Sequence, residues 1–209
     1  MNQQKQLVAA QAIEYISRKY TNDLVLGIGS GSTVQFFIEQ IKLIQHKCKS
    51  FVASSLHTEY CLQQQGIVVD NSQLMNIDVY IDSADQVNKN LYMLKGGGSA
   101  LTREKILAVN AREFICIVDN SKIVDNFSYP VVVESINIAR PYVAKKLISL
   151  GGQPVWREDC ITDNGNSIID VYHLSMANLM QLEQEINNIT GVVENGIFAH
   201  CPANILLHL

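Results

Sequence analysis

The chain has 209 residues, of which 47% are hydrophobic and 17% are charged, a composition typical of a globular protein with a substantial core. Its net charge of −4 and pI near 5.7 provide no basic surplus to neutralise a phosphate backbone, so we expect no nucleic-acid partner. No apolar run approaches the roughly 20 residues that cross a bilayer, so we expect no membrane partner either. A small anion held by a few local lysines remains compatible with this charge.

The cysteines and histidines narrow the chemistry further. The five cysteines form no CxxC pair, and the polar start MNQQKQ lacks a signal-peptide pattern. These features predict reduced thiols in a cytoplasmic protein. The five histidines form neither HxH nor HExxH spacing, so no metal site is predicted.

The first part of the chain alternates between helical and strand patterns. Apolar residues recur at three- and four-residue steps over 3–19, which predicts a helix. A buried strand over 24–28, a glycine loop and a second helix to about residue 44 follow. Further strands are predicted at 51–53, 67–69, 77–81 and 114–118, with helices from Ser54 or Ser55 to about 65 and over 101–111. This alternation predicts a Rossmann-like α/β domain with an open, mostly parallel sheet.

From about residue 129 the pattern indicates a smaller α+β unit. A strand over 131–136 and a helix over 139–150 are predicted, and Gly151-Gly152 suits a left-handed helix cap. Strands at 154–157 and 167–172 flank the turn DNGN, because Asn-Gly is a strong hairpin signal. A helix over 178–188 and strands near 192 and 205 complete the order β-α-β-β-α-β, which predicts a ferredoxin-like unit.

These patterns predict two domains. We expect a catalytic α/β domain over 1–128 with the C-terminal strand 200–209, and a smaller α+β lid domain over 129–199. No Pro/Gly/Ser-rich linker separates them, so the second domain is expected to pack closely as a lid.

The glycine loop GIGSGST (27–33) stands where a strand ends and a helix begins. Gly31 permits close backbone approach, while Ser30, Ser32 and Thr33 add hydroxyl donors at a helix N-terminus, a setting suited to phosphate. Similar loops bind dinucleotides or S-adenosylmethionine, or only make a tight turn. The dinucleotide fingerprint requires a glycine where Ser32 or Thr33 stands, and the Gly-Lys of a P-loop is missing. A phosphate site, a site for a dinucleotide or S-adenosylmethionine, and a purely structural turn therefore all stay open as interpretations of this loop.

The segment IDSADQVN places two carboxylates just past an apolar strand. Asp82 and Asp85, with Ser83 and Ala84 between them, lie where side chains of open α/β sheets converge on a ligand crevice. Such carboxylates can bind sugar hydroxyls or exchange protons with them. The alternative is an Asx turn that caps the next element.

The segment KGGGSALTREKI has three consecutive glycines. Gly96, Gly97 and Gly98 each cost about 0.5–1 kcal/mol relative to alanine in regular structure, which indicates that the backbone must contact something there. Their N–H groups beside Lys95 suit a developing oxyanion, and Glu104 in the following helix suits a general base. The alternative for Glu104 is a solvated helix residue that pairs with a neighbouring cation.

Together these segments resemble the ribose-5-phosphate isomerase type A family. The matching stretches occur in family order over nearly the whole chain: GIGSGSTV (27–34), SSLHTE (54–59), DSADQVN (82–88), KGGGSALTREKI (95–106), FICIVDNSK (114–122), LGGQPVWR (150–157), TDNGNSIIDV (162–171) and GVVENGIFA (191–199). The resemblance implies an aldose–ketose isomerase that interconverts D-ribose 5-phosphate and D-ribulose 5-phosphate in the non-oxidative branch of the pentose phosphate pathway. It further implies a cytoplasmic homodimer or higher homo-oligomer that needs no metal or other cofactor.

The resemblance also implies roles for individual residues. Glu104 matches the general base, which acts through an enediolate, and Asp82, Asp85 and Lys95 match residues of ring opening and proton handling. The amides of 96–98 match the oxyanion-stabilising loop. The implied substrate contacts are Ser30, Gly31, Ser32, Thr33, Ser83, Ala84, Gly96, Gly97, Gly98, Lys122 and Lys5. By position alone, Lys122 could equally be an ordinary surface lysine.

The chain departs from the family pattern at a few positions. Family members usually have TGST and DGADE, where this chain has Ser30, Ser83 and Gln86. Ser83 adds a side chain in the crevice, and Gln86 removes a charge near Asp85. A non-catalytic sugar-phosphate sensor of related fold is the alternative function, because fold alone does not establish catalysis.

Overall fold

The computed structural model of the chain describes residues 2–209 and divides into two compact units. Unit 1 contains the residues up to 84 together with 103–123 and 203–209, and unit 2 contains 85–102 and 124–202. The domain boundaries predicted above stay a prediction. In the structure, 85–102 falls in unit 2 because a strand within it pairs with a strand at 197–198. Within the described residues, no helix is both long and apolar enough to cross a membrane.

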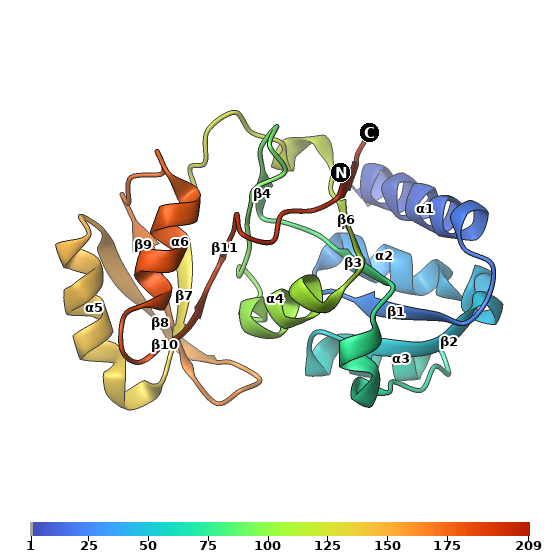
Figure 1. Cartoon of the computed structure of the whole chain (residues 1–209), viewed down its shortest axis with the longest axis horizontal. Coiled ribbons are helices and arrows are strands. Elements are labelled where there is room, and N and C mark those ends of the chain that lie inside the picture. Colours follow the sequence, from blue (N-terminus) through green and yellow to red (C-terminus); the bar gives the residue numbers. More distant parts are fainter. Residues whose placement is uncertain (1) are drawn as a thin grey trace. The chain divides into compact units, whose positions relative to one another are not determined.

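Unit 1 contains a five-stranded parallel sheet with helices on both faces. The strands lie in the order β12-β6-β3-β1-β2, and every neighbouring pair is parallel. Figure 1 shows α1 and α2 together on one side of this sheet and α3 on the other. The strands are β1 (Leu24–Ile28), β2 (Cys48–Ala53), β3 (Val79–Asp82), β6 (Glu113–Ile117) and β12 (Ile205–Leu207). The α-helices are α1 (Asn2–Lys19), α2 (Ser32–Gln40), α3 (Leu56–Gln64) and the part of α4 (Leu101–Asn110) from residue 103 onward, and the 3-10 turns are η1 (Ile41–Leu43), η2 (Gln45–Lys47), η3 (Asn71–Asn76) and η4 (Asn120–Lys122).

The core of unit 1 follows from the sequence pattern. Every residue of β1 is buried, as expected for a strand covered on both faces. The apolar stripe of α1, which includes Val8, Ala12 and Ile16, packs into the same core as Phe37 of α2. The predicted mostly parallel α/β sheet is therefore confirmed.

Two local predictions in unit 1 are wrong. The segment 67–69 forms no strand. Its pairing with β2 is limited to an isolated bridge between Val69 and Phe51, in which the Asp70 N–H donates to the Phe51 carbonyl. The second helix ends at Gln40 rather than near residue 44, and two 3-10 turns follow it. The predicted cap of α3 is confirmed at Ser55, whose hydroxyl accepts a hydrogen bond of 3.0 Å from the Thr58 N–H.

Unit 2 contains an antiparallel four-stranded sheet in the order β10-β7-β9-β8. Its elements are β7 (Val131–Ser135), η5 (Asn137–Ala139), α5 (Arg140–Ser149), β8 (Gln153–Ile161), β9 (Ser167–Tyr172), α6 (Leu179–Asn187) and β10 (Val192–Asn195). This is the β-α-β-β-α-β order of a ferredoxin-like unit, as predicted. Gly151, which follows the C-cap residue of α5, has a φ of 86°, the left-handed conformation expected at this position.

A three-stranded sheet in unit 2 was not predicted. It has the order β11-β5-β4, with β4 (Gln86–Val87), β5 (Met93–Leu94) and β11 (Ile197–Phe198). Strands of two residues are too short to produce an alternating pattern, so the sequence carries no signal for them. The predicted strand near 205 belongs to the parallel sheet of unit 1, where it pairs with β6.

A polar cluster joins α1 to the start of β6. The Glu113 carboxylate accepts hydrogen bonds from Lys19 Nζ at 2.5 Å, Tyr20 Oη at 2.5 Å and Tyr15 Oη at 3.1 Å. Burial favours the neutral acid, but the hydrogen bonds from Lys19 and the two tyrosines outweigh it and lower the pKa of Glu113 below its ordinary value. The ionised carboxylate therefore contributes to the stability of unit 1.

This cluster predicts an acid-sensitive contribution to stability. A carboxyl whose folded-state pKa is depressed contributes fully above its unfolded pKa, near 4.5, and loses that contribution as the pH falls through the folded value. We expect Glu113→Gln to lower the free energy of unfolding at pH 7 and to flatten its decline below pH 4.5. Urea unfolding of both proteins across this range measures the effect. Parallel stability curves would contradict the assignment.

Candidate functional site

The loops that follow β1 and β3 lie side by side, because these two strands pair in parallel. β1 lies between β2 and β3, so the chain order reverses at β1, and ligands of open α/β sheets bind at the carboxyl ends of strands at such a point. The Gly29 N–H donates to the Ile81 carbonyl at 2.7 Å. A Cβ on Gly29 would overlap the Asp82 carboxyl group, so only glycine permits this approach.

Asp82 ties these two loops together. It is fully buried, and its Oδ1 accepts hydrogen bonds from the N–H groups of Ser30 at 2.9 Å and Ser83 at 2.7 Å. Its Oδ2 accepts a hydrogen bond from the Tyr80 hydroxyl. Burial raises the pKa of Tyr80 well above its ordinary value, and the charges of Asp82 and Glu104 act in the same direction. Tyr80 therefore remains a protonated donor to Asp82.

The hydroxyl loop meets the N-terminus of α2. Gly31 has a φ of 96° and precedes Ser32, the first residue of the helix. Ser32 is exposed and accepts a hydrogen bond of 2.8 Å from Lys5 Nζ, while Thr33 is buried. The structure thus brings Lys5, 27 residues away in the sequence, to the predicted phosphate loop. Helix N–H groups, hydroxyls and a lysine together suit an anionic group.

Glu104 lies on α4 and is 4% exposed. Its Oε1 accepts a hydrogen bond from the Ser30 hydroxyl. The alternative of a solvated helix residue is therefore wrong. A buried carboxylate beside a hydroxyl loop is suited to proton transfer, because desolvation and a fixed partner can tune it for that task.

Two further predicted contacts belong to unit 1. Lys122 ends η4 after β6 and is half-buried, and its N–H donates to the Asp119 carbonyl at 3.0 Å. The Asp119 side chain caps this turn by accepting from the Ser121 N–H at 3.0 Å. Ala84 is buried immediately after Ser83.

The remaining predicted site residues belong to unit 2. Asp85 Oδ2 accepts a hydrogen bond of 2.8 Å from the Gly97 N–H, and a Cβ on Gly97 would lie 2.8 Å from Asp85 Oδ1. Gly96 has a φ of 111°, in the region that favours glycine. Lys95 is 4% exposed, with its Nζ 5.5 Å from the centroid of the Phe198 ring. The structure therefore joins Asp85 to the glycine loop and explains why 96 and 97 are glycines.

Sequence reasoning missed three residues that support the predicted site: Tyr80 and Arg157 contact it directly, and Asp170 contacts Arg157. The sequence pattern marks Tyr80 only as part of an apolar strand and indicates no role for Arg157 or Asp170. The hydrogen bond from Tyr80 to Asp82 spans two residues of one strand, a spacing that places both side chains on one face. Arg157 meets the glycine loop from 61 residues away, so no local signal was present.

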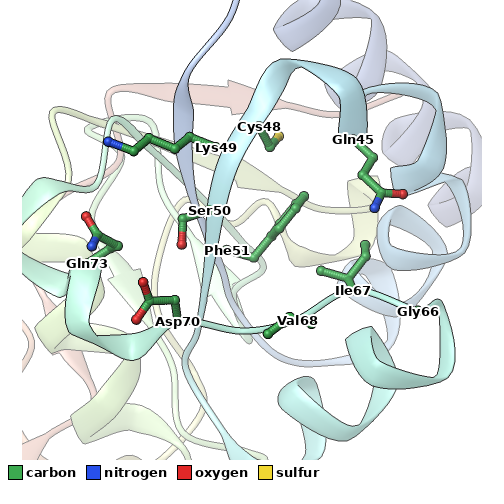
Figure 2. Close-up of a pocket in the computed structure, with 10 residues that line it drawn as sticks. All are labelled: Gln45, Cys48, Lys49, Ser50, Phe51, Gly66, Ile67, Val68, Asp70 and Gln73. Carbon is green, nitrogen blue, oxygen red and sulfur yellow. The ribbon is translucent and has the colours of Figure 1, made fainter.

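A pocket elsewhere in unit 1 does not involve any predicted site residue. It has a volume of about 430 Å³ and lies between the start of β2 and the segment 66–73 (Figure 2). Its polar lining includes Gln45, Lys49, Ser50, Asp70 and Gln73. It opens at the amino end of β2, whereas ligands of such sheets bind at the carboxyl ends. Among residues 2–209, no group of three or more His, Cys, Asp or Glu side chains is arranged to hold a metal ion.

Comparison with known proteins places the chain in a family. The profile of Ribose 5-phosphate isomerase A (phosphoriboisomerase A) matches residues 50–208. Ribose-5-phosphate isomerase A of Haemophilus influenzae (strain 86-028NP) is 48% identical over 212 residues, which cover 99% of this chain and 95% of that protein.

Solved structures agree. The crystal structure of ribose 5 phosphate isomerase A from Neisseria gonorrhoeae has a TM-score of 0.92 at 40% identity and covers 98% of this chain and 91% of that one. A structure of D-ribose-5-phosphate isomerase in complex with phospho-erythronic acid has a TM-score of 0.89 at 34% identity, with coverage of 98% and 93%. The family profile, the sequence identity and the fold all agree, and the chain belongs to the ribose 5-phosphate isomerase A family of aldose–ketose isomerases.

Proposed function

We propose that this chain interconverts D-ribose 5-phosphate and D-ribulose 5-phosphate, with Glu104 as the general base. The observation that carries the proposal is the buried Glu104 carboxylate, hydrogen-bonded to Ser30 in the loop that leads into α2. Family membership supplies the reaction class, and this contact supplies a base held beside an anion-binding loop.

The reaction follows from what a carboxylate can do to an open-chain aldose. Glu104 takes the proton from C2, and the electrons of that C–H bond form the C1–C2 double bond while the carbonyl oxygen at C1 becomes an oxyanion. The same carboxyl group then returns its proton to C1. The proton of the C2 hydroxyl moves to the oxygen on C1, which leaves a ketone at C2 and conserves every atom. The oxyanion appears only during the reaction, so donors aimed at it accelerate the step.

The other predicted residues are assigned to ring opening, charge stabilisation and binding. Lys95 and the amides of 96–98 are assigned to the developing oxyanion, and Asp85 and Lys95 also to ring opening and proton handling at the sugar oxygens. Asp82 is assigned to ring opening and proton handling. Its hydrogen bond from the Ser30 N–H also holds the loop that contacts Glu104.

The phosphate is assigned to the start of α2. Exposed Ser32 and Gly31, with the lysine at position 5 bonded to Ser32, support this assignment. Thr33, Ser83 and Lys122 are assigned to the same end of the substrate. Ser83 stands where the usual DGADE pattern has glycine. Its Oγ donates a hydrogen bond of 3.1 Å to the Ser30 carbonyl.

A direct assay tests the proposed function. Ribulose 5-phosphate formation from ribose 5-phosphate is measured with the purified chain in chelator-treated buffer, and we expect full turnover. Phospho-erythronic acid, a phosphorylated sugar acid bound by a related isomerase, is expected to compete with the substrate. Thermal stabilisation by ribose 5-phosphate without turnover would instead indicate a non-catalytic sensor, and stabilisation only by a nucleotide or S-adenosylmethionine would indicate a different ligand class.

The proposal includes a homodimer that works in the cytoplasm. The family resemblance supports the dimer, and the five free cysteines support a reducing compartment. Light scattering on the eluted protein should give about twice the 23.3 kDa of one chain.

A further inference from the structure

We propose that Arg157, held by Asp170, is a positioning residue that determines which side of the Gly96–Gly98 loop presents N–H donors to the substrate. The inference rests on the proposed function, because it concerns the oxyanion loop of that reaction. Arg157 contacts the loop within unit 2, across 61 residues of sequence.

The Arg157 side chain is fixed by a bidentate ion pair. Nε donates to Asp170 Oδ2 at 2.9 Å, and Nη2 donates to Asp170 Oδ1 at 2.5 Å. The two residues extend from the paired strands β8 and β9, and their side chains are 24% and 15% exposed. Two parallel hydrogen bonds to a half-buried carboxylate fix the plane of the guanidinium, which a single contact would not do.

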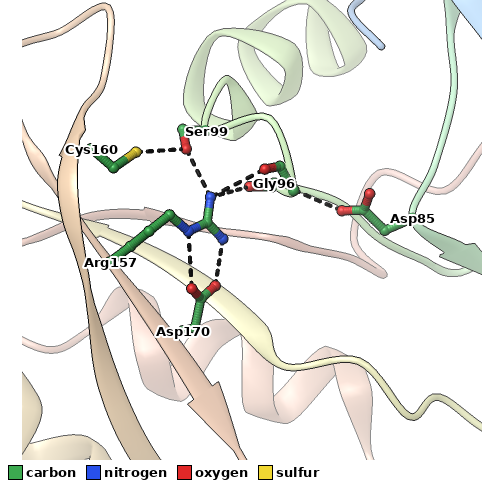
Figure 3. Close-up of polar contacts among 7 residues, drawn as sticks. Asp85, Gly96, Ser99, Arg157, Cys160 and Asp170 are labelled. Carbon is green, nitrogen blue, oxygen red and sulfur yellow. Dashed lines mark hydrogen bonds and ion pairs between the residues drawn. The ribbon is translucent and has the colours of Figure 1, made fainter. Parts of the chain in front are cut away.

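The third nitrogen of the guanidinium is directed at the glycine loop. Nη1 donates to the carbonyl oxygens of Gly96 and Gly97, both at 3.2 Å, and to the Ser99 hydroxyl at 2.8 Å. Figure 3 shows the guanidinium between Asp170 on one side and the turn from Gly96 to Ser99 on the other. All three nitrogens of Arg157 are thus used, two by the carboxylate and one by the loop.

Because a peptide unit is planar, the direction of each carbonyl determines the direction of the N–H group in the same peptide unit. No peptide bond among residues 2–209 is cis, so each C=O points opposite to the N–H of the following residue. The Gly96 carbonyl faces Arg157, and the Gly97 N–H accordingly points away from it and donates to Asp85. The Gly97 carbonyl also faces Arg157, so the Gly98 N–H points away from the guanidinium as well.

Three consecutive glycines do not select this orientation by themselves. Glycine populates both signs of φ with little preference, so each peptide plane in the loop can rotate unless something holds it. Arg157 donates to the Gly96 and Gly97 carbonyls on one side, and Asp85 accepts from the Gly97 N–H on the other. The Ser99 N–H also donates to the Gly96 carbonyl at 2.9 Å, whereas Arg157 is the group that holds the Gly97 carbonyl. These contacts fix the directions of the Gly97 and Gly98 N–H groups, the first of which donates to Asp85, and such preorganisation is what oxyanion stabilisation requires.

Arg157 remains charged across the working pH range. Burial works against its charge, but the hydrogen bond and the charge of Asp170 raise the pKa of Arg157 above its ordinary value.

The competing interpretation is that Arg157 only braces the fold of unit 2. Arg157→Lys separates the two interpretations, because lysine keeps the charge beside Asp170 but lacks the planar fork that can bind a carboxylate and the loop together. Asp170→Asn is the second variant, since it keeps the shape of the partner and weakens the anchor of the guanidinium. Arg140→Lys is the matched control: this arginine of the same unit stacks on Trp156, with its Cζ 3.8 Å from the ring centroid.

The experiment combines steady-state kinetics on ribose 5-phosphate with NMR of the protein labelled with ¹⁵N-glycine. The chain has 12 glycines, so the resonances of the loop amides can be assigned and followed. For Arg157→Lys we expect kcat to fall about 10–100-fold. A donor that no longer points at the oxyanion should lower kcat by no more than complete removal of that donor would. KM should stay within about twofold, because the lost interaction forms only in the transition state. The Gly97 and Gly98 resonances should shift, Asp170→Asn should show a smaller effect in the same direction, and Arg140→Lys should match the wild type.

Two results would overturn the inference. In one, folded Arg157→Lys or Asp170→Asn protein retains wild-type kcat. In the other, kcat falls while the loop amide resonances remain unchanged, so the effect does not pass through the loop. Absence of turnover in the wild-type chain would refute the proposed function instead, and the NMR comparison would still decide whether Arg157 orients the loop.

Discussion

Glu104→Gln is expected to lower kcat for ribose 5-phosphate isomerisation by about 10²–10⁴-fold, the usual contribution of a general base. Glutamine has nearly the same shape and can still accept the hydrogen bond from Ser30, so the packing of α4 is retained. What is lost is the ability to take a proton from C2 and return it to C1. KM should change little, because the proton is transferred in the transition state and not in the ground state.

The control for this prediction is Glu59→Gln on α3, which removes the same charge from a partly exposed position outside the predicted site. We expect wild-type kinetics from it. Ser30→Ala is the companion variant, since it deletes the hydroxyl that donates to Glu104 and should reduce kcat less than loss of the carboxylate does. If Glu104→Gln keeps wild-type turnover, another group is the base and the proposed mechanism is wrong.

Glu134→Ala is expected to destabilise unit 2 by about 3 kcal/mol or more. Glu134 is fully buried on β7, and its Oε1 accepts hydrogen bonds from Thr162 Oγ1 at 2.8 Å, Asn164 Nδ2 at 3.1 Å and Asn166 Nδ2 at 2.8 Å. Its Oε2 accepts a hydrogen bond from the Thr102 hydroxyl. Removing the carboxylate leaves these donors facing a cavity, and each unsatisfied buried group adds to the cost.

The measurement is urea unfolding followed by the fluorescence of Trp156, the single tryptophan, which lies on β8 of the same unit. Thr102 lies on α4 two residues before Glu104. We therefore also expect the Glu134→Ala variant to have a lower kcat at urea concentrations where it is still folded. Glu158→Ala is the matched control, since Glu158 is exposed on β8. An equal loss of stability in both variants would show that the hydrogen-bond network of Glu134 has no special importance.

The sequence predicted the elements that have a strong local pattern. The apolar stripe of α1, the buried run of β1 and the Asn-Gly turn between β8 and β9 each depend on residues close together in the chain, and each was identified correctly. The segment at 67–69 has the same apolar character and forms only one bridge. Its pairing depends on whether a neighbouring strand is available along its whole length, and local composition does not contain that information.

The same distinction applies to the candidate site. By itself the sequence determined which loops carry glycines, hydroxyls and carboxylates, and that these loops follow strands of a parallel sheet, because hydrophobic periodicity and turn chemistry are local properties. Only the tertiary structure decided which donor meets which acceptor. Ser30 and Glu104 are 74 residues apart, and Arg157 is 61 residues from Gly96. Contacts at such separations form only when whole elements pack, so the buried partner of Glu104 and the arginine that orients the glycine loop could not be derived from residue spacing alone.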